Sequence, residues 1–206
     1  MILEEIKSAF VENKVAILVA IAILFISLIL GYIFEPQLYD YFNPVVDDLT
    51  QKIQSGTVKI TFQDIFLNNI NIVFSMFIYG ICFCFSALIL GFNGFFVGYY
   101  VATSDNLVAT LLLIIPHGIF EFSSCILACA SGFVLFNFIF KFLLTLWRED
   151  DESVKVSVLN AFNQSSVKLK QAIIIFIFSA ILMAIAGFVE AYLTFPIASA
   201  ILNFFG

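Results

Sequence analysis

The amino-acid sequence predicts an all-α protein, a polytopic bundle of about five helices that each cross a membrane. Of its 206 residues, 62% are hydrophobic and only 12% are charged. Soluble domains carry roughly 45–50% apolar and about 25% charged residues, so this chain has too few charges to cover a soluble fold. The apolar residues also gather in runs near the roughly 20 residues that a helix needs to cross a bilayer. We therefore expect a single membrane domain over residues 1–206, with lipid as its surroundings.

The first predicted span covers residues 15–34, a run without a charged side chain. The pair Glu35 and Pro36 ends it, because proline disrupts the interior of a helix. The segment 35–69 follows as the largest polar loop, and it is acidic. Apolar side chains recur at helical spacing in this acidic outer loop, which predicts a short amphipathic helix along the membrane surface.

A second span is expected over residues 70–90. Before it, Thr61 and Asp64 resemble a helix-capping box with Asp in place of Glu. After it, the sequence Gly91-Phe-Asn93-Gly94 predicts a tight turn.

The third predicted span, residues 95–115, contains the polar triplet Ser104-Asp105-Asn106. A charge at the bilayer centre costs about 2.5–3.5 kcal/mol on insertion scales, so the triplet is unexpected inside a span. Either one span is broken in its middle, or two half-helices re-enter the membrane with the triplet at their junction. The remaining spans are expected at residues 118–140, after Pro116, and at residues 171–194, before Pro196.

Lysine and arginine predict the orientation, because cytoplasmic loops are enriched in them. The connection 141–170 holds five of the nine basic residues, and Lys7 and Lys14 precede the first span. We expect both regions to be cytoplasmic in the cell membrane, which five spans satisfy with the C-terminus outside. A re-entrant segment would place the connection outside, and the basic residues disfavour that arrangement.

Small residues at four-residue spacing predict close helix packing, either within the bundle or between copies in a homo-oligomer. The residues concerned are Gly94, Gly98, Ser124, Ala128 and Gly132.

Ionisable residues inside the predicted spans are the strongest candidates for a functional site. His117 and Glu121 lie four residues apart, on one face of a helix. Glu190 lies near the end of the fifth span, and antiparallel neighbouring spans would bring it to the depth of Glu121. We expect these three side chains to form an intramembrane polar cluster, with Asn93 and Asp105 as further candidates.

Several roles are open to this cluster. The glutamates can be protonated and hydrogen-bond across helices to hold the bundle, they can handle protons or ions on a transport path, or they can bind a lipid headgroup or a partner helix. One histidine and two carboxylates can also supply the three protein ligands of a zinc site. The chain has a single histidine and lacks the H-E-x-x-H pattern, so we assign no metal, cofactor or catalytic residue.

The sequence also excludes other classes of protein. It contains no P-loop, no G-x-S-x-G and no dinucleotide-binding fingerprint, so we do not expect an enzyme. The net charge of −6 argues against nucleic acid as a partner, because nucleic-acid-binding surfaces are basic.

Several of these motifs together resemble the stage II sporulation protein M family. The resemblance covers roughly residues 60 to 200, and Pro116-His117-Gly118-Ile119-Phe120-Glu121 is its most specific element. The other matching elements are Leu67-Asn68-Asn69, Gly91-Phe92-Asn93-Gly94 with Gly98, and the run from Gly187 to Pro196.

The resemblance implies an integral membrane protein with several spans. In spore-forming bacteria, members act in septal wall thinning and engulfment, and they anchor wall hydrolases to the membrane. The family is also similar to proteins of archaea and of bacteria that never sporulate.

We therefore predict a membrane scaffold or assembly factor for a membrane or envelope protein partner, which would dock on the outer loop 35–69 or on the connection 141–170. The alternative is a small oligomeric transporter or channel that uses the His117, Glu121 and Glu190 cluster, because broken helices often bind ions or substrates.

Overall fold

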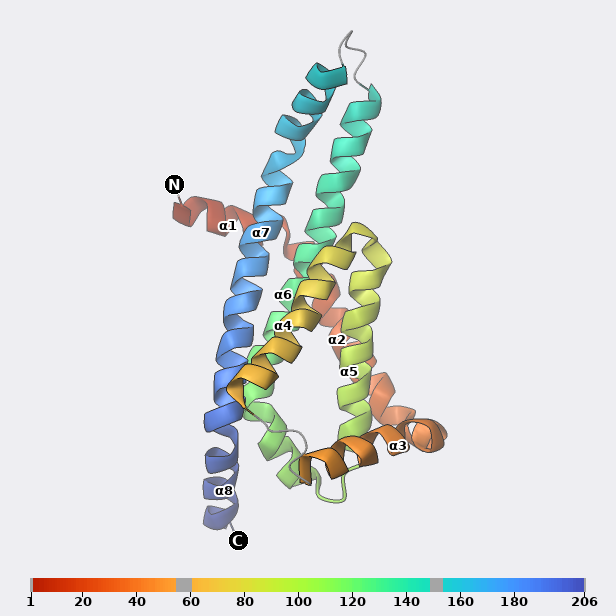
Figure 1. Cartoon of the computed structure of the whole chain (residues 1–206), viewed down its shortest axis with the longest axis vertical. Coiled ribbons are helices and arrows are strands. Elements are labelled where there is room, and N and C mark those ends of the chain that lie inside the picture. Colours follow the sequence, from red (N-terminus) through yellow and green to blue (C-terminus); the bar gives the residue numbers. More distant parts are fainter. Residues whose placement is uncertain (1, 55–60, 149–153, 206) are drawn as a thin grey trace.

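The computed structural model describes residues 2–54, 61–148 and 154–205, which are almost wholly helical (Figure 1). Five of the described helices are long and apolar enough to cross a membrane, which confirms the predicted all-α bundle of five spans. The elements in chain order are α1 (Ile2–Glu12), α2 (Lys14–Ile33), α3 (Glu35–Gln54), α4 (Phe62–Ile78), the 3-10 turn η1 (Tyr79–Ile81), α5 (Phe83–Ala102), α6 (Leu107–Arg148), α7 (Val154–Tyr192) and α8 (Thr194–Phe205). The spans are α2, α4 with η1, α5, α6 and α7.

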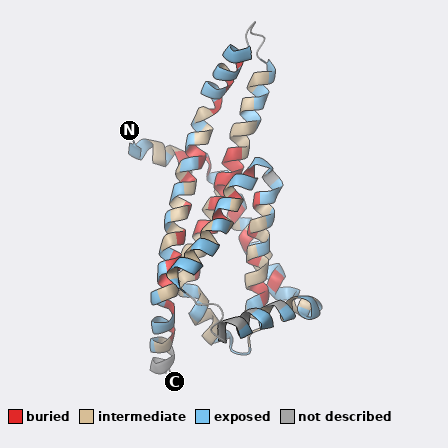
Figure 2. Cartoon of the chain, viewed as in Figure 1, coloured by how far each residue is buried: buried red, intermediate tan, exposed pale blue. Residues whose placement is uncertain are grey.

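Helices α6 and α7 pair along their length and form the centre of the bundle. Helix α2 pairs with α5, and α4 packs on both α6 and α7. Buried residues gather where the middle of α6 meets its neighbours (Figure 2). The main core cluster contains Leu24, Val73, Met76, Leu90, Ala128, Cys129 and Met183 among others.

The outer faces of the spans carry large exposed apolar side chains. On α2, for example, Leu18 is 61% exposed and Ile26 is 57% exposed. Exposed apolar surface of this kind is stable in hydrocarbon, where the helices satisfy their own backbone hydrogen bonds. The distribution of apolar residues therefore supports a membrane-spanning bundle.

The two ends of the bundle differ in what they contain (Figure 1). Helix α3, the α5–α6 connection and α8 lie at one end, which we call the C-terminal end. The N-terminus and the tops of α6 and α7 lie toward the other, which we call the N-terminal end.

Helix α3 occupies most of the segment predicted as the acidic outer loop. The expected amphipathic helix is present and is 20 residues long, from Glu35 to Gln54. Pro36 lies in its first turn, where proline is tolerated because the missing N–H has no helical partner there. Residues 55–60, in the second half of the loop, lie outside the described part of the chain.

The second span begins earlier than the predicted 70–90 and also ends earlier. Thr61 caps α4, since the backbone N–H of Asp64 donates to Thr61 Oγ1 at 3.2 Å, as the capping pattern predicted. The chain then turns at η1, and α5 begins at Phe83. Hydropathy could not locate this turn, because the run on both sides of it is apolar.

The predicted tight turn at Gly91–Gly94 is instead the middle of α5. Its glycines serve helix packing: a Cβ on Gly94 would lie 2.8 Å from the carbonyl oxygen of Leu24 on α2, and a Cβ on Gly98 would overlap that of Leu28. The prediction of close packing at Gly94 and Gly98 agrees with these contacts, whereas the turn was wrong.

The helix break expected within residues 95–115 is present at residues 103–106. It separates two full spans, α5 and α6, so the polar triplet belongs to the connection between them and not to the middle of a span. Asp105 is exposed in this connection. Asn106 caps α6, since its side-chain oxygen accepts from the Ala109 N–H at 3.0 Å.

The last two spans are longer than the predicted 118–140 and 171–194. Helix α6 runs through Pro116 for 42 residues, and α7 has 39 residues. A proline removes one backbone hydrogen bond, and packing in a membrane bundle tolerates this, so Pro116 does not end the helix. Helix α7 ends at Tyr192, before Pro196, which lies in the first turn of α8.

Candidate functional site

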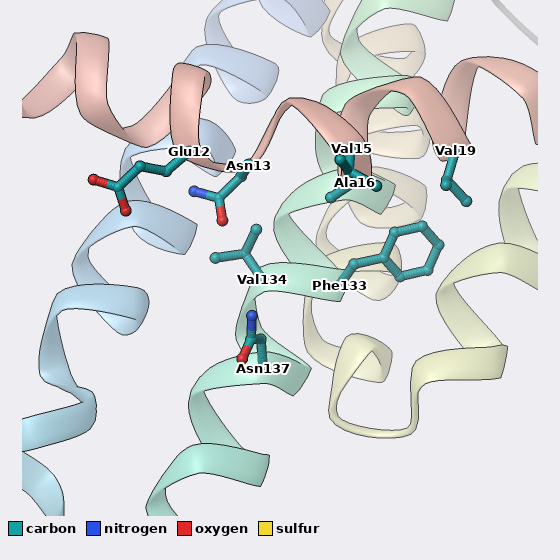
Figure 3. Close-up of a pocket in the computed structure, with 8 residues that line it drawn as sticks. All are labelled: Glu12, Asn13, Val15, Ala16, Val19, Phe133, Val134 and Asn137. Atoms are coloured by element: carbon teal, nitrogen blue, oxygen red, sulfur yellow. The ribbon is translucent and has the colours of Figure 1, made fainter.

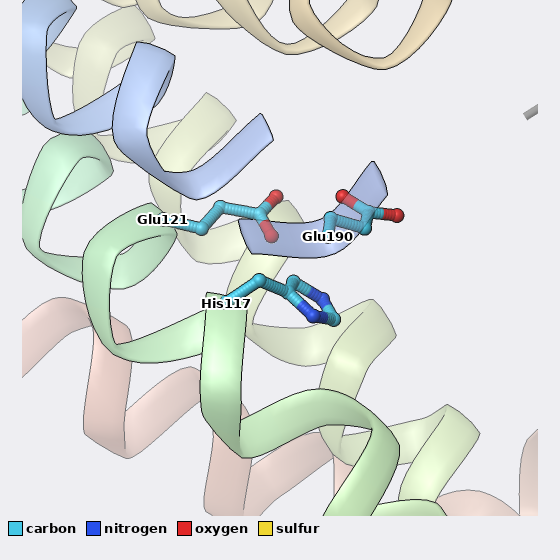
Figure 4. Close-up of side chains that lie close together, drawn as sticks. All are labelled: His117, Glu121 and Glu190. Carbon is cyan, nitrogen blue, oxygen red and sulfur yellow. The ribbon is translucent and has the colours of Figure 1, made fainter. Parts of the chain in front are cut away.

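The intramembrane cluster predicted from the sequence forms between α6 and α7 at the C-terminal end of the bundle. His117 and Glu121 extend from successive turns of α6, and Glu190 extends from the last turn of α7 (Figure 4). One nitrogen of the histidine and one oxygen of each carboxylate all lie within 4.8 Å of one another. All three side chains are half-buried.

Thr194 holds the imidazole of His117 from the start of α8. The Thr194 hydroxyl lies 3.2 Å from His117 Nδ1, and it donates to the carbonyl oxygen of Val189 at 3.1 Å. A hydroxyl has one proton to donate, so with that proton on Val189 the Thr194 Oγ1 accepts from His117 in the tautomer that carries its proton on Nδ1. In that neutral tautomer, the Nε2 atom of His117 is unprotonated and has a free lone pair.

Small residues bring the two helices close enough for the cluster to form. One turn beyond Glu121, Ser124 and Ser179 make reciprocal bonds in which each hydroxyl donates to the other's carbonyl oxygen at 2.7 Å. Both serines are fully buried. Bonds between membrane helices contribute about 0.6 kcal/mol each on average, so this pair helps to fix the register of α6 on α7.

Neither carboxylate of the cluster has a hydrogen-bond or ion-pair partner among the described residues. Two acidic side chains at this depth would repel each other if both were ionised. The cluster can therefore share a proton, hold a cation, or offer acceptors to a bound polar group.

The other two predicted members lie elsewhere. Asn93 is on α5, and its side chain donates to the carbonyl oxygen of Ile89 in the same helix at 2.8 Å. Asp105 is in the exposed α5–α6 connection and is not part of the group of potential ligands. Sequence spacing identified the three residues that meet, because two share a helix face and the third is on the antiparallel neighbour.

A second polar network, at the N-terminal end, was not predicted from the sequence. Asn13 and Gln171 are 6% and 3% exposed, and Asn13 Nδ2 donates to Gln171 Oε1 at 2.9 Å. Lys168 donates to the same Gln171 oxygen at 2.7 Å and pairs with Glu12 at 3.3 Å. The sequence holds one indication of this network: Asn13 and Gln171 each stand at the polar start of a predicted span.

A pocket of about 290 Å³ lies beside this network, between the α1–α2 junction and α6 (Figure 3). Its polar side chains are Glu12, Asn13 and Asn137, and the remaining wall is apolar. The pocket is small and open, and the polar atoms of Asn13 are already bonded to Gln171, Lys168 and Ala9. We therefore treat the network as the attachment of α1 to α7.

A bundle of five apolar helices of membrane length, with ionisable side chains gathered between two of them, defines a multi-pass integral membrane protein. Residues 15–195 match the Stage II sporulation protein M family, and the chain belongs to that family. This confirms the resemblance carried by the Pro116–Glu121 element and the closing motif.

Two relatives are uncharacterized proteins of Methanocaldococcus jannaschii. One is 30% identical over 180 residues, which cover 84% of this chain and 93% of that protein. The other is 31% identical over 207 residues, which cover 95% of this chain and 89% of that protein. No solved structure matches the chain.

Proposed function

We propose that this member of the family is a membrane scaffold that holds a partner protein at the cytoplasmic face through the hairpin formed by α6 and α7. The observation that carries the proposal is the length of these two helices. They have 42 and 39 residues, whereas α2 crosses the membrane with 20. At 1.5 Å per residue, α6 and α7 are about 60 Å long, roughly twice the thickness of the hydrocarbon core.

The additional length lies at the N-terminal end, where α6 and α7 continue past the other spans (Figure 1). The network of Asn13 and Gln171 marks the level at which α2 begins. We define the hairpin extension as residues 138–148 and 154–170, which continue from that level to the ends of the described helices. On α7 this is 17 residues, or about 25 Å of helix, and it keeps the direction of the bundle instead of turning along a membrane surface.

The hairpin extension exposes large apolar side chains where the expected surroundings are aqueous. Trp147 is 89% exposed, Leu159 is 58% exposed and Phe140 is 56% exposed. Exposed apolar residues that gather on one element are typical of protein-interaction sites, and tryptophan is enriched among interface residues that dominate binding.

In the sequence, the basic residues of the hairpin extension flank the acidic run 149–152. The described charged side chains of the hairpin extension are all basic, namely Lys141, Arg148, Lys155, Lys168 and Lys170, and the last two pair with Glu12 and Glu5 of α1. The acidic run 149–152 lies outside the described residues. We infer a protein partner that presents an apolar helix face, since such a face complements the exposed Trp147, Leu159 and Phe140 side chains.

The test is co-purification from native membranes in mild detergent. We expect a partner to co-purify with the wild type in near-stoichiometric amount. The Trp147→Glu and Leu159→Glu variants should not retain the partner, because each places an acid in the proposed contact. Tyr41→Glu is the matched control, because Tyr41 is 77% exposed on α3 at the opposite end of the bundle. Capture that survives both hairpin variants, or a wild type that elutes only as a homo-oligomer, would contradict the proposal.

The transporter alternative has less support than the scaffold. It was based on the polar triplet as a break within a span and on the His117, Glu121 and Glu190 cluster. The triplet connects two complete spans, so the cluster alone favours transport.

A further inference from the structure

The most unusual group of side chains in the described bundle is the one formed by His117, Glu121 and Glu190 between α6 and α7. We propose that these three residues bind a divalent transition-metal ion, with Zn²⁺ the best match to the ligand set. The proposal goes beyond the scaffold function and does not depend on it.

The donor types and their spacing fit such an ion. Zinc takes imidazole nitrogen and carboxylate oxygen at about 2.0–2.2 Å, which puts two ligands of a tetrahedral site roughly 3.4 Å apart. The potential ligand atoms here already lie within 4.8 Å of one another without an ion. Rotation of two long glutamate side chains would close the remaining gap of up to about 1.4 Å. A fourth position would remain open for water or a further ligand.

The charge of the group also favours a divalent cation. Two ionised carboxylates carry two negative charges, and the described residues supply neither of them with an ion-pair or hydrogen-bond partner. A divalent ion neutralises both charges at once, which removes the cost of keeping them in an apolar surrounding. Calcium and magnesium fit less well, because they require six or more oxygen ligands and disfavour an imidazole.

The hydrogen bonds behind His117 prepare it as a ligand. A metal-binding histidine usually donates its other ring N–H to an acceptor that fixes the tautomer. Thr194 has this role here, since its own proton goes to the carbonyl oxygen of Val189 and its oxygen accepts from Nδ1. In the tautomer with its proton on Nδ1, the lone pair of Nε2 is available to a metal ion.

The order of the chain gives the bound ion a mechanical consequence. Two ligands come from α6, the third comes from the last turn of α7, and Thr194 begins α8. A bound ion would fasten α6 to the last turn of α7, and the hydrogen bond from His117 to Thr194 would connect it to the start of α8. The temperature of unfolding should then rise with the concentration of metal, because the ion binds only the folded state.

The direct experiment is titration of the purified, chelator-stripped protein with Co²⁺, followed by its d–d absorption, and with Zn²⁺ as competitor. We expect one ion per chain for the wild type and no saturable binding for Glu121→Gln combined with Glu190→Gln. Thr194→Val should bind with about 10–100-fold lower affinity, the usual effect of losing a supporting hydrogen bond. Asp105→Asn is the control, since it removes an acid at the same end of the bundle outside the cluster.

Thermal unfolding in the presence of chelator shows whether each variant is folded. If the glutamine variants do not fold, the Co²⁺ titration is made with His117→Asn and Thr194→Val, which leave both carboxylates intact. The proposal is overturned if the wild type binds no Co²⁺, or if its affinity is unchanged in every folded variant of the cluster.

Discussion

Glu12 is the side chain whose surroundings most clearly alter its chemistry outside the membrane-spanning segments. Its carboxylate accepts from Gln171 Nε2 at 2.9 Å, from Ser8 Oγ at 2.6 Å and from Lys168 Nζ at 3.3 Å. These donors, Gln171 first, lower the pKa of Glu12 from 4.5 to about 2. The carboxylate attaches α1 to α7 although its side chain is about half exposed.

We predict that this attachment weakens at low pH. The pKa of Glu12 is lower in the folded protein than the ordinary 4.5, so the ionised form stabilises the fold above pH 4.5, and that contribution is lost as the pH falls toward 2. The protection of α1 backbone amides from hydrogen exchange, corrected for the pH dependence of intrinsic exchange, should fall over this interval in the wild type.

The matched variant for this prediction is Glu12→Gln, which keeps the size of the side chain and cannot titrate. Its α1 should exchange faster than that of the wild type at neutral pH and should respond less to acid. Equal acid responses in the two proteins would show that Glu12 does not hold α1.

Among single residues, the sequence identified His117, Glu121 and Glu190, because ionisable residues are rare in membrane spans and the spacing along a helix is regular. It did not identify Thr194 as the partner of His117. A threonine near a helix end is common, and only the break between α7 and α8 turns it toward the imidazole.

Helix pairing depends on glycines where two backbones touch. Helix α5 approaches α2 so closely that a Cβ on Gly98 would overlap the backbone carbonyl of Leu28. Gly31 on α2 makes the reciprocal approach to Phe95. In a membrane, close packing of this kind is a main source of helix association, because lipid provides no hydrophobic driving force between helices.

We predict that Gly98→Ala destabilises the bundle by about 1–3 kcal/mol, because the methyl group forces α5 away from α2. Unfolding in mixed detergent micelles measures the change. Gly187→Ala is the control: its Cβ would meet the ring of Phe62 at 3.5 Å, an ordinary contact, so its stability should be unchanged or slightly higher. Similar losses for both variants would contradict the role assigned to Gly98.

Across the whole molecule, the five spans run alternately between the two ends of the bundle. The N-terminus therefore lies toward one end and α8 lies at the other (Figure 1). The N-terminal end holds Lys7 and Lys14 and the basic residues of the hairpin extension. Because cytoplasmic loops are enriched in basic residues, we expect this end to face the cytoplasm.

Reporter fusions in a bacterial host test this orientation. A green fluorescent protein fused to the C-terminus should stay dark, and alkaline phosphatase at the same position should be active, since each reporter folds on one side of the membrane only. A fusion of fluorescent protein to the N-terminus should be bright and serves as the control. The opposite pattern would reverse the orientation and place the hairpin extension outside the cell.

The sequence by itself determined the membrane environment, the number of spans, the membership of the family and the three residues of the polar cluster. These depend on composition and on helical periodicity, which are local properties that a chain carries wherever it folds. The tertiary structure alone decided where helices turn within continuous apolar sequence, as at η1, and that α6 continues through Pro116. It also decided that Gly94 and Gly98 pack against α2 and that Asn13 meets Gln171. Those outcomes depend on which distant backbones approach each other, and in an apolar chain many segments are equally suited to be buried, so packing makes the choice.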